Sequence, residues 1–235
     1  MKKLGLIGGT GPESTLVYYK EINRQVNEAT GGKQFPEIAI ESVNLFKALN
    51  LVSEKRYDEL ESYLLQAAQN LQNGGADIIA LTAGTMHLVY DRLKSKIAKP
   101  FISIPQTVAE YAVECGYKRL GLLGTIFTME NTFLTKPFTD CGIEVFVPEE
   151  ADRITINQII GGELEYGIVK EESRQKLISE IKKMKQNWEI DGIILGCTEL
   201  PLALNSQNCP VACLDIMEIH IRKLVQMLVE DKTKS

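Results

Sequence analysis

Several features that mark whole classes of protein are missing from this 235-residue sequence. No apolar run approaches the roughly 20 residues that a membrane helix needs, so no contact with a membrane is expected. Positive charge is not in excess: 26 basic residues stand against 31 acidic ones, and the net charge of -5 argues against a nucleic-acid partner. The only two histidines are His87 and His220, which excludes a metal site built on three imidazoles.

Cysteines are few and form no disulfide or zinc pattern. The chain has five, an odd number with no C-x-x-C pair, which favours reduced thiols and a cytoplasmic protein. The first residues, Met1 to Gly9, contain a basic pair, but glycine soon interrupts the apolar stretch that follows it. This start is therefore interpreted as a strand and not as a signal peptide.

The composition is that of a globular protein, with 44% hydrophobic and 24% charged residues. The length suits one large domain or two small ones. Short, nearly continuous runs of Ile, Leu, Val and Ala are typical of strands that are buried on both faces of a parallel sheet. The predicted strands are Leu4–Gly8, Glu37–Val43, Asp77–Thr82, Phe101–Ile104, Arg119–Gly124, Glu144–Val147, Asp191–Gly196 and Val211–Leu214.

Between these strands lie segments whose apolar residues recur every three to four positions, as they do in amphipathic helices. The alternation of strands and helices predicts an α/β fold with right-handed crossovers. The predicted helices are Ser14–Asn27, Ser53–Gln72, Ala151–Tyr166, Glu171–Gln186 and Asp215–Glu230.

The two halves of the chain also resemble each other. Leu6–Thr10 can be laid on Leu122–Thr125, 116 positions later, and Asp77–Thr82 on Asp191–Gly196, 114 positions later. This self-similarity predicts two related α/β domains. Their expected bounds are 1–98 plus 210–235 for the first domain and 99–209 for the second.

Four predicted strand ends are rich in glycine, threonine, cysteine and glutamate, and ligands of open parallel sheets bind beyond such ends. Each precedes a predicted helical stretch, whose first N–H groups favour an anion, so together they predict a small site for a carboxylate. The alternative is that Gly and Thr merely make tight turns and caps. The four are Gly8–Gly11, Thr82–Thr85, Gly124-Thr125 and Gly196–Glu199.

A dinucleotide site is not indicated. The spacing Gly5-x-x-Gly8-Gly9-x-Gly11 differs from G-x-G-x-x-G, and the second strand ends near Ser42 without the expected acidic residue. A phosphate-binding loop of the G-x-x-x-x-G-K-[ST] type is also missing.

Cys197 is the most informative single residue. It follows a buried strand and precedes Thr198, which is expected to cap a helix. Helix N–H groups there would lower the pKa of the thiol, and the thiolate could then accept a proton from carbon or attack carbon. The alternative is an inert buried cysteine, the interpretation also given to Cys115, Cys141, Cys209 and Cys213. His87 and His220 could face the same site, although a structural role is favoured for both.

Five motifs are distinctive when taken together: Gly5–Thr15, Thr85-Met86-His87, Leu123-Gly124-Thr125, Asn157–Ile160 and Gly196–Glu199. Together they resemble the aspartate/glutamate racemase family, in its branch of cofactor-independent amino-acid racemases. The resemblance runs the length of the chain and implies two Rossmann-like domains related by a pseudo-twofold axis, with the active site in the cleft between them. It also implies a homodimer, no pyridoxal phosphate and no metal.

Within this resemblance, two residues, usually cysteines, exchange protons with opposite faces of the substrate α-carbon. Cys197 matches the second of them. At the first, this sequence has Ala83, followed by Gly84 where the family has asparagine. The nearest hydroxyl is Thr82, and the internal match leaves open whether Ala83 (spacing 114) or Thr82 (spacing 115) corresponds to Cys197. One position matters, because side chains alternate in direction along a strand.

The residues predicted to act on the substrate follow from these motifs. Cys197 and Thr82 are the predicted catalytic pair, with His87 or a water as other sources of the second proton. Lys47 or Arg56 could bind a side-chain carboxylate of the substrate. The predicted substrate-binding residues are Gly9, Thr10, Gly84, Thr85, Thr125, Thr128, Thr198 and Glu199.

Three functions remain open at this stage. The first is a racemase or epimerase of an amino acid, with aspartate or glutamate favoured. The second is a lyase with one thiol, which protonates the enediolate left when a carboxylic acid loses CO2. The third is a carboxylate-binding protein without turnover. A further alternative is that Ala83 is an engineered substitution at the first catalytic position.

Overall fold

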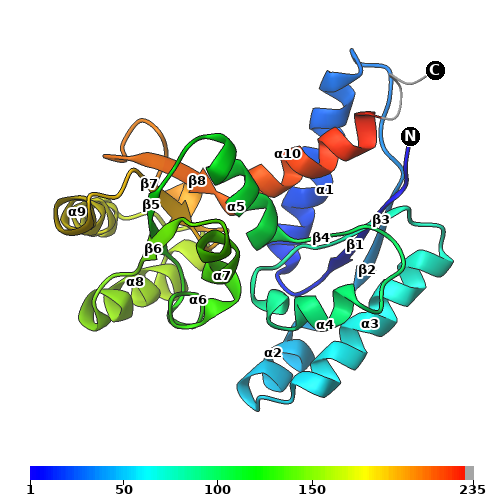
Figure 1. Ribbon diagram of the computed structural model, residues 1–235, viewed down its shortest axis with the longest axis horizontal. Helices are drawn as coiled ribbons and strands as arrows, with labels where there is room; N and C mark the ends of the chain where they lie inside the picture. The colour runs from blue at the N-terminus through cyan, green and yellow to red at the C-terminus, as the bar shows by residue number, and fades with distance from the viewer. Residues whose placement is uncertain (231–235) are drawn as a thin grey trace. The chain divides into compact units, whose positions relative to one another are not determined.

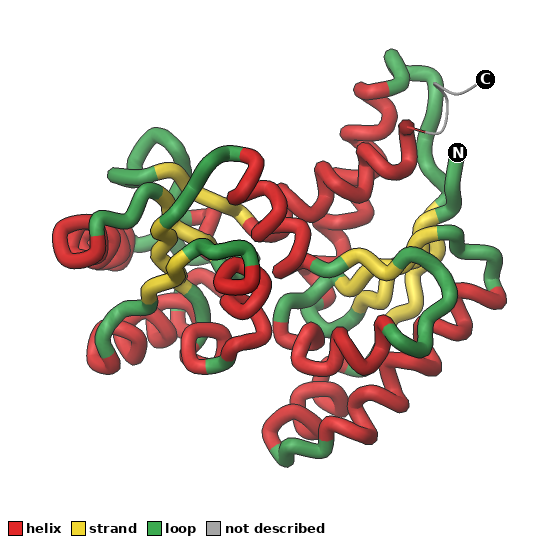
Figure 2. Tube along the Cα trace, in the orientation of Figure 1, coloured by secondary structure: helices red, strands yellow, loops and turns green. Residues whose placement is uncertain are grey.

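The computed structural model describes residues 1–230 and divides them into two compact α/β units. Of the described residues, the first unit contains 1–104 and 220–230, and the second contains 105–219. Each unit is a parallel sheet with helices packed around it (Figures 1 and 2). Among the helices of residues 1–230, none combines the length and the apolar composition that crossing a bilayer requires.

The first unit has a four-stranded sheet in the order β2-β1-β3-β4. Helix α3 packs on β1 and β2, while α1 and α10 lie side by side and are joined by a hydrogen bond between Tyr18 and His220 (Figure 1). The elements are β1 (Leu4–Gly8), α1 (Pro12–Ala29), β2 (Ile38–Ser42), α2 (Leu45–Ser53), α3 (Tyr57–Asn73), β3 (Ile78–Leu81), the 3-10 turn η1 (Thr85–Val89), α4 (Tyr90–Lys94), β4 (Phe101–Ile102) and α10 (Ile216–Val229).

The second unit has its four strands in the equivalent order, β6-β5-β7-β8. Helix α9 packs against β5, as α3 packs against β1 in the first unit. The elements are α5 (Ile104–Glu114), β5 (Arg119–Leu123), α6 (Ile126–Glu130), α7 (Thr132–Asp140), β6 (Glu144–Phe146), α8 (Glu150–Gly162), η2 (Leu164–Tyr166), α9 (Glu171–Trp188), β7 (Gly192–Leu195), η3 (Leu200–Leu202) and β8 (Ala212–Asp215).

The predicted α/β class and all eight predicted strands are confirmed. One helix prediction is wrong, because Ser53–Gln72 is not continuous: α2 ends at Ser53 and α3 begins at Tyr57. Lys55 between them has φ = 56°, a left-handed conformation that ends an α-helix. The periodicity of the apolar residues continues across this break and therefore did not reveal it.

Strand pairing corrects the predicted place of two strands. The bounds 98/99 and 209/210 would put Phe101–Ile102 in the second domain and Ala212–Asp215 in the first. In the structure β4 pairs with β3 and β8 pairs with β7, so each strand belongs to the other sheet. An apolar run shows that a strand is present but not which strand it pairs with, and the remaining domain assignment stays a prediction.

The inner strand pairs of the two units share two features, an aspartate that accepts a backbone hydrogen bond and a glycine with close neighbours. Asp77 accepts a hydrogen bond from the backbone N–H of Lys3, and Asp191 accepts one from Lys118, each at 2.9 Å. Gly5 and Gly121 leave room for close neighbours on the sheet. An added Cβ atom would lie 2.9 Å from Ala76 and 3.2 Å from Leu71 of α3 at the first position, and 2.9 Å from Met184 of α9 at the second. The inner strands therefore run in matching registers, and their carboxyl ends meet at one edge of each sheet.

Candidate active site

In the first unit, the turn after β1 is organised by one hydroxyl group. The Thr15 hydroxyl accepts a hydrogen bond from the Gly9 N–H at 3.0 Å and lies 3.0 Å from the Gly11 carbonyl. Gly9 has φ = 84°, and a Cβ atom there would lie 2.2 Å from the Val43 carbonyl oxygen. Glycine is required at this position, and the predicted Gly9 turn is a rigid part of the sheet edge.

Thr82 lies against the same hydroxyl group. Its side chain is 1% exposed, and its hydroxyl lies 3.2 Å from the Thr15 hydroxyl and 3.3 Å from the carbonyl oxygen of Ile7. These contacts tie the end of β3 to β1 and to α1. The structure thus places the Thr82 side chain inside the unit, while Ala83, Gly84 and Thr85, which follow it, are partly exposed.

Backbone hydrogen bonds decide which residue corresponds to Cys197. The Thr82 N–H donates to the carbonyl of Ile7 at 3.2 Å, and the Gly196 N–H donates to the carbonyl of Leu123 at 2.8 Å. These are equivalent bonds in the two sheets, so Thr82 corresponds to Gly196, and the next residue, Ala83, corresponds to Cys197. The structure therefore supports the spacing of 114. The residue of the first unit that corresponds to Cys197 is Ala83, whose side chain is only a methyl group.

His87 is a structural residue that secures the turn after β3. Its Nδ1 lies 3.1 Å from the carbonyl oxygens of Ala83 and Gly84, and its Nε2 accepts the Ile104 N–H at 3.0 Å. Accepting that bond requires an unprotonated Nε2, so the ring is neutral with its proton on Nδ1. Burial lowers the pKa of His87 to about 4, against a smaller opposing effect of the two carbonyl groups. Both ring nitrogens are thus occupied within the protein.

In the second unit, Cys197 forms a pair with Glu199. The Cys197 thiol donates to Glu199 Oε2 at 2.9 Å, and the Thr198 hydroxyl donates to Glu199 Oε1 at 2.7 Å. All three residues are partly exposed just beyond the carboxyl end of β7. Two roles predicted from the sequence need correction here, those of the thiol as a thiolate and of Thr198 as a helix cap.

The surroundings of Cys197 favour the thiol over the thiolate, whereas the sequence predicted a lowered pKa. Burial first, and then the negative charge of Glu199, raise the pKa of the Cys197 thiol above its ordinary value. The backbone N–H of Glu199 has a smaller opposing effect on this pKa. The helix that follows, η3, has only three residues and no side-chain cap, so it is not the helix capped by Thr198 that the sequence predicted at this point. Thr198 instead directs its hydroxyl to the Glu199 carboxylate.

The turn after β5 is fixed by threonine and asparagine side chains. Thr125 caps α6 by accepting a hydrogen bond from the Thr128 N–H, and the two hydroxyl groups lie 3.1 Å apart. Asn157, on α8, accepts the Ile126 N–H at 2.9 Å. Thr128 is buried and Thr125 is partly exposed, so Thr125 is the better placed of these two predicted ligands.

Thr10 is buried without a partner for its hydroxyl oxygen within residues 1–230. It follows Gly9 at the end of β1, next to the end of β3. A buried hydroxyl without a partner costs roughly 1–3 kcal/mol, which a ligand that hydrogen-bonds to it would restore. This atom therefore supports the prediction that Thr10 binds a substrate.

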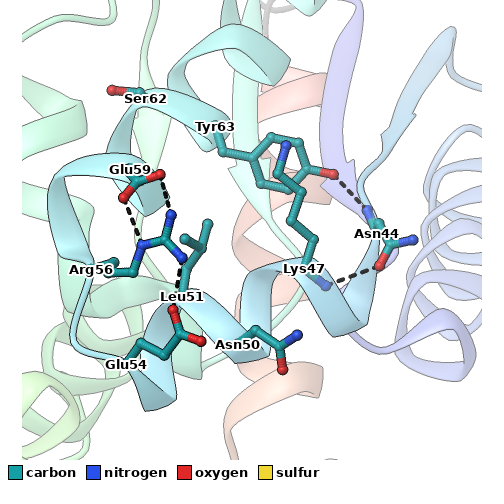
Figure 3. A pocket seen from close by; sticks show the side chains of 9 residues that line it. All are labelled: Asn44, Lys47, Asn50, Leu51, Glu54, Arg56, Glu59, Ser62 and Tyr63. Atoms are coloured by element: carbon teal, nitrogen blue, oxygen red, sulfur yellow. Dashed lines mark hydrogen bonds and ion pairs between the residues drawn. The ribbon is translucent and has the colours of Figure 1, made fainter.

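The two predicted carboxylate-binding cations differ in their surroundings. Both line a pocket of about 760 Å³ between α2 and α3 (Figure 3). Arg56 already pairs with Glu54 and Glu59, at 2.7 and 2.6 Å. The Lys47 ammonium lies 4.0 Å above the Tyr63 ring and has no ion pair among residues 1–230. Lys47 is thus the cation that can accept a carboxylate without breaking an existing ion pair.

Two residues with important roles were missed as candidates. Thr15 holds the β1 turn and Thr82, and Asn157 holds the β5 turn. Both lie within motifs that carry the family resemblance. The sequence thus showed that these segments matter but not that their side chains act on the protein's own backbone.

Known proteins share the fold and the sequence motifs of this chain. The model of the Asp/Glu/Hydantoin racemase family matches residues 7–224, and this chain belongs to that family. The broad specificity amino-acid racemase RacX of Bacillus subtilis (strain 168) is 24% identical over 219 residues, which cover 90% of this chain and 92% of that protein.

Two crystal structures share both the fold and more than a third of the sequence. A candidate Asp/Glu racemase from Yersinia pestis has a TM-score of 0.93 and 36% identity, covering 97% of this chain and 100% of its own. An aspartate racemase homologue from Pyrococcus horikoshii OT3 has a TM-score of 0.88 and 37% identity, covering 97% of this chain and 99% of its own. The two-domain α/β fold is shared along the chain.

The state of His87 predicts how stability depends on pH. The folded ring has a pKa of about 4 against 6.5 for an ordinary histidine, so as pH falls through 6.5 the unfolded chain takes up a proton first. Stability should therefore fall between pH 6.5 and 4, with His87 contributing about 2 kcal/mol of the loss between pH 7 and 5. Urea unfolding at the two pH values measures it, and His87→Gln should show a smaller difference.

Nuclear magnetic resonance tests the same prediction directly, because the chain has only two histidines. The His87 ring should stay neutral from pH 8 to 5.5, with the proton on Nδ1. Titration of His87 near pH 6.5 would contradict the assigned hydrogen bonds.

The Cys197–Glu199 pair predicts a thiol that becomes more reactive when the carboxylate is removed. Glu199→Gln should lower the pKa of Cys197 and speed its alkylation by iodoacetamide at pH 8, about tenfold for each pKa unit. The measurement follows the tryptic peptide Gln186–Arg222 in a background with serine at positions 209 and 213. Glu172→Gln, an exposed change on α9, is the matched control and should leave the rate unchanged. Equal rates for both variants would show that Glu199 does not control the thiol.

Proposed function

We propose that this protein is a cofactor-independent racemase or epimerase of an amino acid, with aspartate or glutamate as the favoured substrates. Cys197 is proposed as one acid/base at the α-carbon. The observation that carries the proposal is a partly exposed thiol, hydrogen-bonded to a carboxylate at the end of β7, in a chain of the Asp/Glu/Hydantoin racemase family.

The proposed chemistry uses the pair in both directions. The protonated thiol delivers its proton to a planar α-carbanion, and the thiolate that results is the base for the reverse step. Glu199 accepts the thiol hydrogen in the resting state and so keeps the S–H bond in a fixed direction. A substrate ammonium group near Glu199 would offset its negative charge and thereby make the thiolate easier to form.

The second proton needs another source, because Ala83 stands at the position equivalent to Cys197 and a methyl group cannot exchange a proton. The sequence offers three candidates, Thr82, His87 and a water molecule. Water is favoured because the Thr82 hydroxyl is buried against Thr15 and the Ile7 carbonyl. His87 is a weaker candidate because both of its ring nitrogens already have partners.

The remaining site residues are proposed to hold carboxylate groups. The unpartnered hydroxyl of Thr10, with the Gly9 turn beside it, suits the α-carboxylate of a substrate. Thr85, Thr125, Thr198 and Gly84 are proposed as further contacts because all are partly exposed at strand ends. Lys47 is proposed to attract a second carboxylate, which favours acidic amino acids. Cytoplasmic location and a homodimer remain predictions.

One observation favours a second candidate, a lyase with one thiol. Only one of the two equivalent positions has an ionisable group, and its thiol donates a hydrogen bond to Glu199. Such a group is ready to protonate an enediolate formed by loss of CO2, a reaction that needs a single proton donor.

Restoring the missing thiol tests the racemase proposal. Single enantiomers of aspartate and glutamate are incubated with the protein, and their optical purity is followed by chiral chromatography. Wild type should racemise at least one of them, and Ala83→Cys should raise the rate by at least about tenfold, because a positioned acid/base contributes 10²–10⁴-fold. Ala83→Ser is the matched control for side-chain size.

Thr82→Val identifies the second proton source, since valine keeps the shape and removes the hydroxyl. Racemisation at the wild-type rate supports water, and its loss in a folded variant assigns the proton to Thr82. No racemisation by wild type or by Ala83→Cys, together with CO2 release from a 2-substituted malonate, would replace the racemase with the lyase.

A further inference from the structure

Strand β2 forms an open edge of the first sheet. Among the four edge strands of residues 1–230 it is the longest, with five residues against two in β4, three in β6 and four in β8. Proteins usually protect such an edge with lysine, proline or a very short strand, because its free N–H and C=O groups pair readily with another chain. Ile38–Ser42 contains neither lysine nor proline. The sequence of β2 is therefore that of a strand that is paired on both sides.

The outward backbone groups of β2 belong to alternate residues. At one end of the strand, the Leu4 N–H donates to the Glu37 carbonyl at 2.9 Å. At the other end, the Val43 N–H donates to the Gly8 carbonyl at 3.0 Å. The odd-numbered residues of β2 thus face β1, and in a parallel ladder the residues between them direct both backbone groups to the other side. The residues that face outward are Ile38, Ile40 and Ser42.

This free edge is symmetric about Ile40. Pro36, four residues before it, has no N–H group. Asn44, four residues after it, already donates its N–H to the Tyr63 hydroxyl at 2.8 Å. An antiparallel copy of β2 centred on Ile40 would place Pro36 of one copy opposite Asn44 of the other, where neither residue has an N–H to offer. The donors and acceptors of β2 therefore match those of a second β2.

Exposed apolar side chains follow the same symmetry. Ile40, at the centre, is 40% exposed. Phe35 comes five residues before it and is 67% exposed, and Phe46 comes six residues after it and is 74% exposed. Antiparallel pairing about Ile40 brings Phe35 of one copy toward Phe46 of the other at both ends of the strand. Two phenylalanines that a single chain leaves in water are thereby covered by each other.

Helix α1 extends this apolar edge. The Asn27 side chain donates to the Gln34 carbonyl at 3.3 Å, just before β2, so this side of α1 faces the β2 edge. Leu16 and Tyr19 are on the same side of the helix, because positions 16, 19, 23 and 27 follow one another at intervals of three and four. Both side chains are exposed. Apolar surface gathered in one place on a protein marks an interaction site.

We propose that two copies of this chain associate through β2, antiparallel and with a two-fold axis at Ile40, so that two four-stranded sheets become one continuous sheet. Ile38 of one copy pairs with Ser42 of the other, and Ile40 pairs with its own counterpart. Each of these pairs exchanges two hydrogen bonds. An interface of this kind is isologous and closes at a dimer. The proposal gives a surface and a register to the homodimer, which were not part of the prediction from the sequence.

The molecular mass in solution tests this interface. Light scattering after gel filtration should give wild type twice the 26.2 kDa of one chain. Ile40→Lys puts two like charges at the centre of the interface and should give the mass of one chain, with an unchanged circular dichroism spectrum. Ile154→Lys is the matched control, since it makes the same change at an isoleucine of α8 that is 43% exposed, and it should stay dimeric. A monomeric wild type, or a dimer that Ile40→Lys leaves intact, would overturn the proposal.

Cysteine cross-linking tests the register without adding charge. The Cα atoms of a hydrogen-bonded antiparallel pair are about 5.5 Å apart, which a disulfide can span. With the exposed Cys115 and Cys141 replaced by serine, Ile40→Cys should form disulfide-linked dimers when oxidised by copper phenanthroline. Ala39→Cys, one position away and on the other face of the sheet, should not. Linked dimers of Ala39→Cys but not of Ile40→Cys would contradict the register and the proposal with it. Both readouts are masses, so neither depends on the proposed racemase activity.

Discussion

Parallel pairing of the inner strands, β1 with β3 and β5 with β7, is the constraint on which the candidate site depends. The registers Ile7 to Leu81 and Leu123 to Leu195 bring two strand ends together in each unit. One residue further along, the Thr82 and Gly196 N–H groups continue the pairing. The second residue after β3, and likewise after β7, is the first one that is free of the sheet. In one unit it is Ala83 and in the other it is Cys197, so two similar folds present different chemistry at equivalent points.

Local electrostatics then decide what the Cys197 thiol can do. Cys197 donates a hydrogen bond to the Glu199 carboxylate, which holds the thiol proton in place. This arrangement suits delivery of a proton.

Much of the fold could be predicted from the sequence, because buried parallel strands appear as short apolar runs and a repeated pattern reveals two similar halves. The strand ends of the site were predictable for the same reason. The direction of Thr82 and the protonation of Cys197 were not, since both depend on side chains that reach the site from other residues, Thr15 and Glu199. The break between α2 and α3 was missed because a left-handed Lys55 leaves no mark on hydrophobic periodicity.

The central claim is that the sulfur of Cys197 exchanges a proton with the α-carbon of a substrate. Proton magnetic resonance of aspartate and glutamate enantiomers, each incubated with the protein in D2O, measures deuterium entering at that carbon. Wild type should incorporate deuterium, and Cys197→Ser that keeps the wild-type fold should do so at least about 10²-fold more slowly, in line with the usual contribution of an acid/base group. Deuterium entering at the wild-type rate in Cys197→Ser would show that this sulfur is not the acid/base.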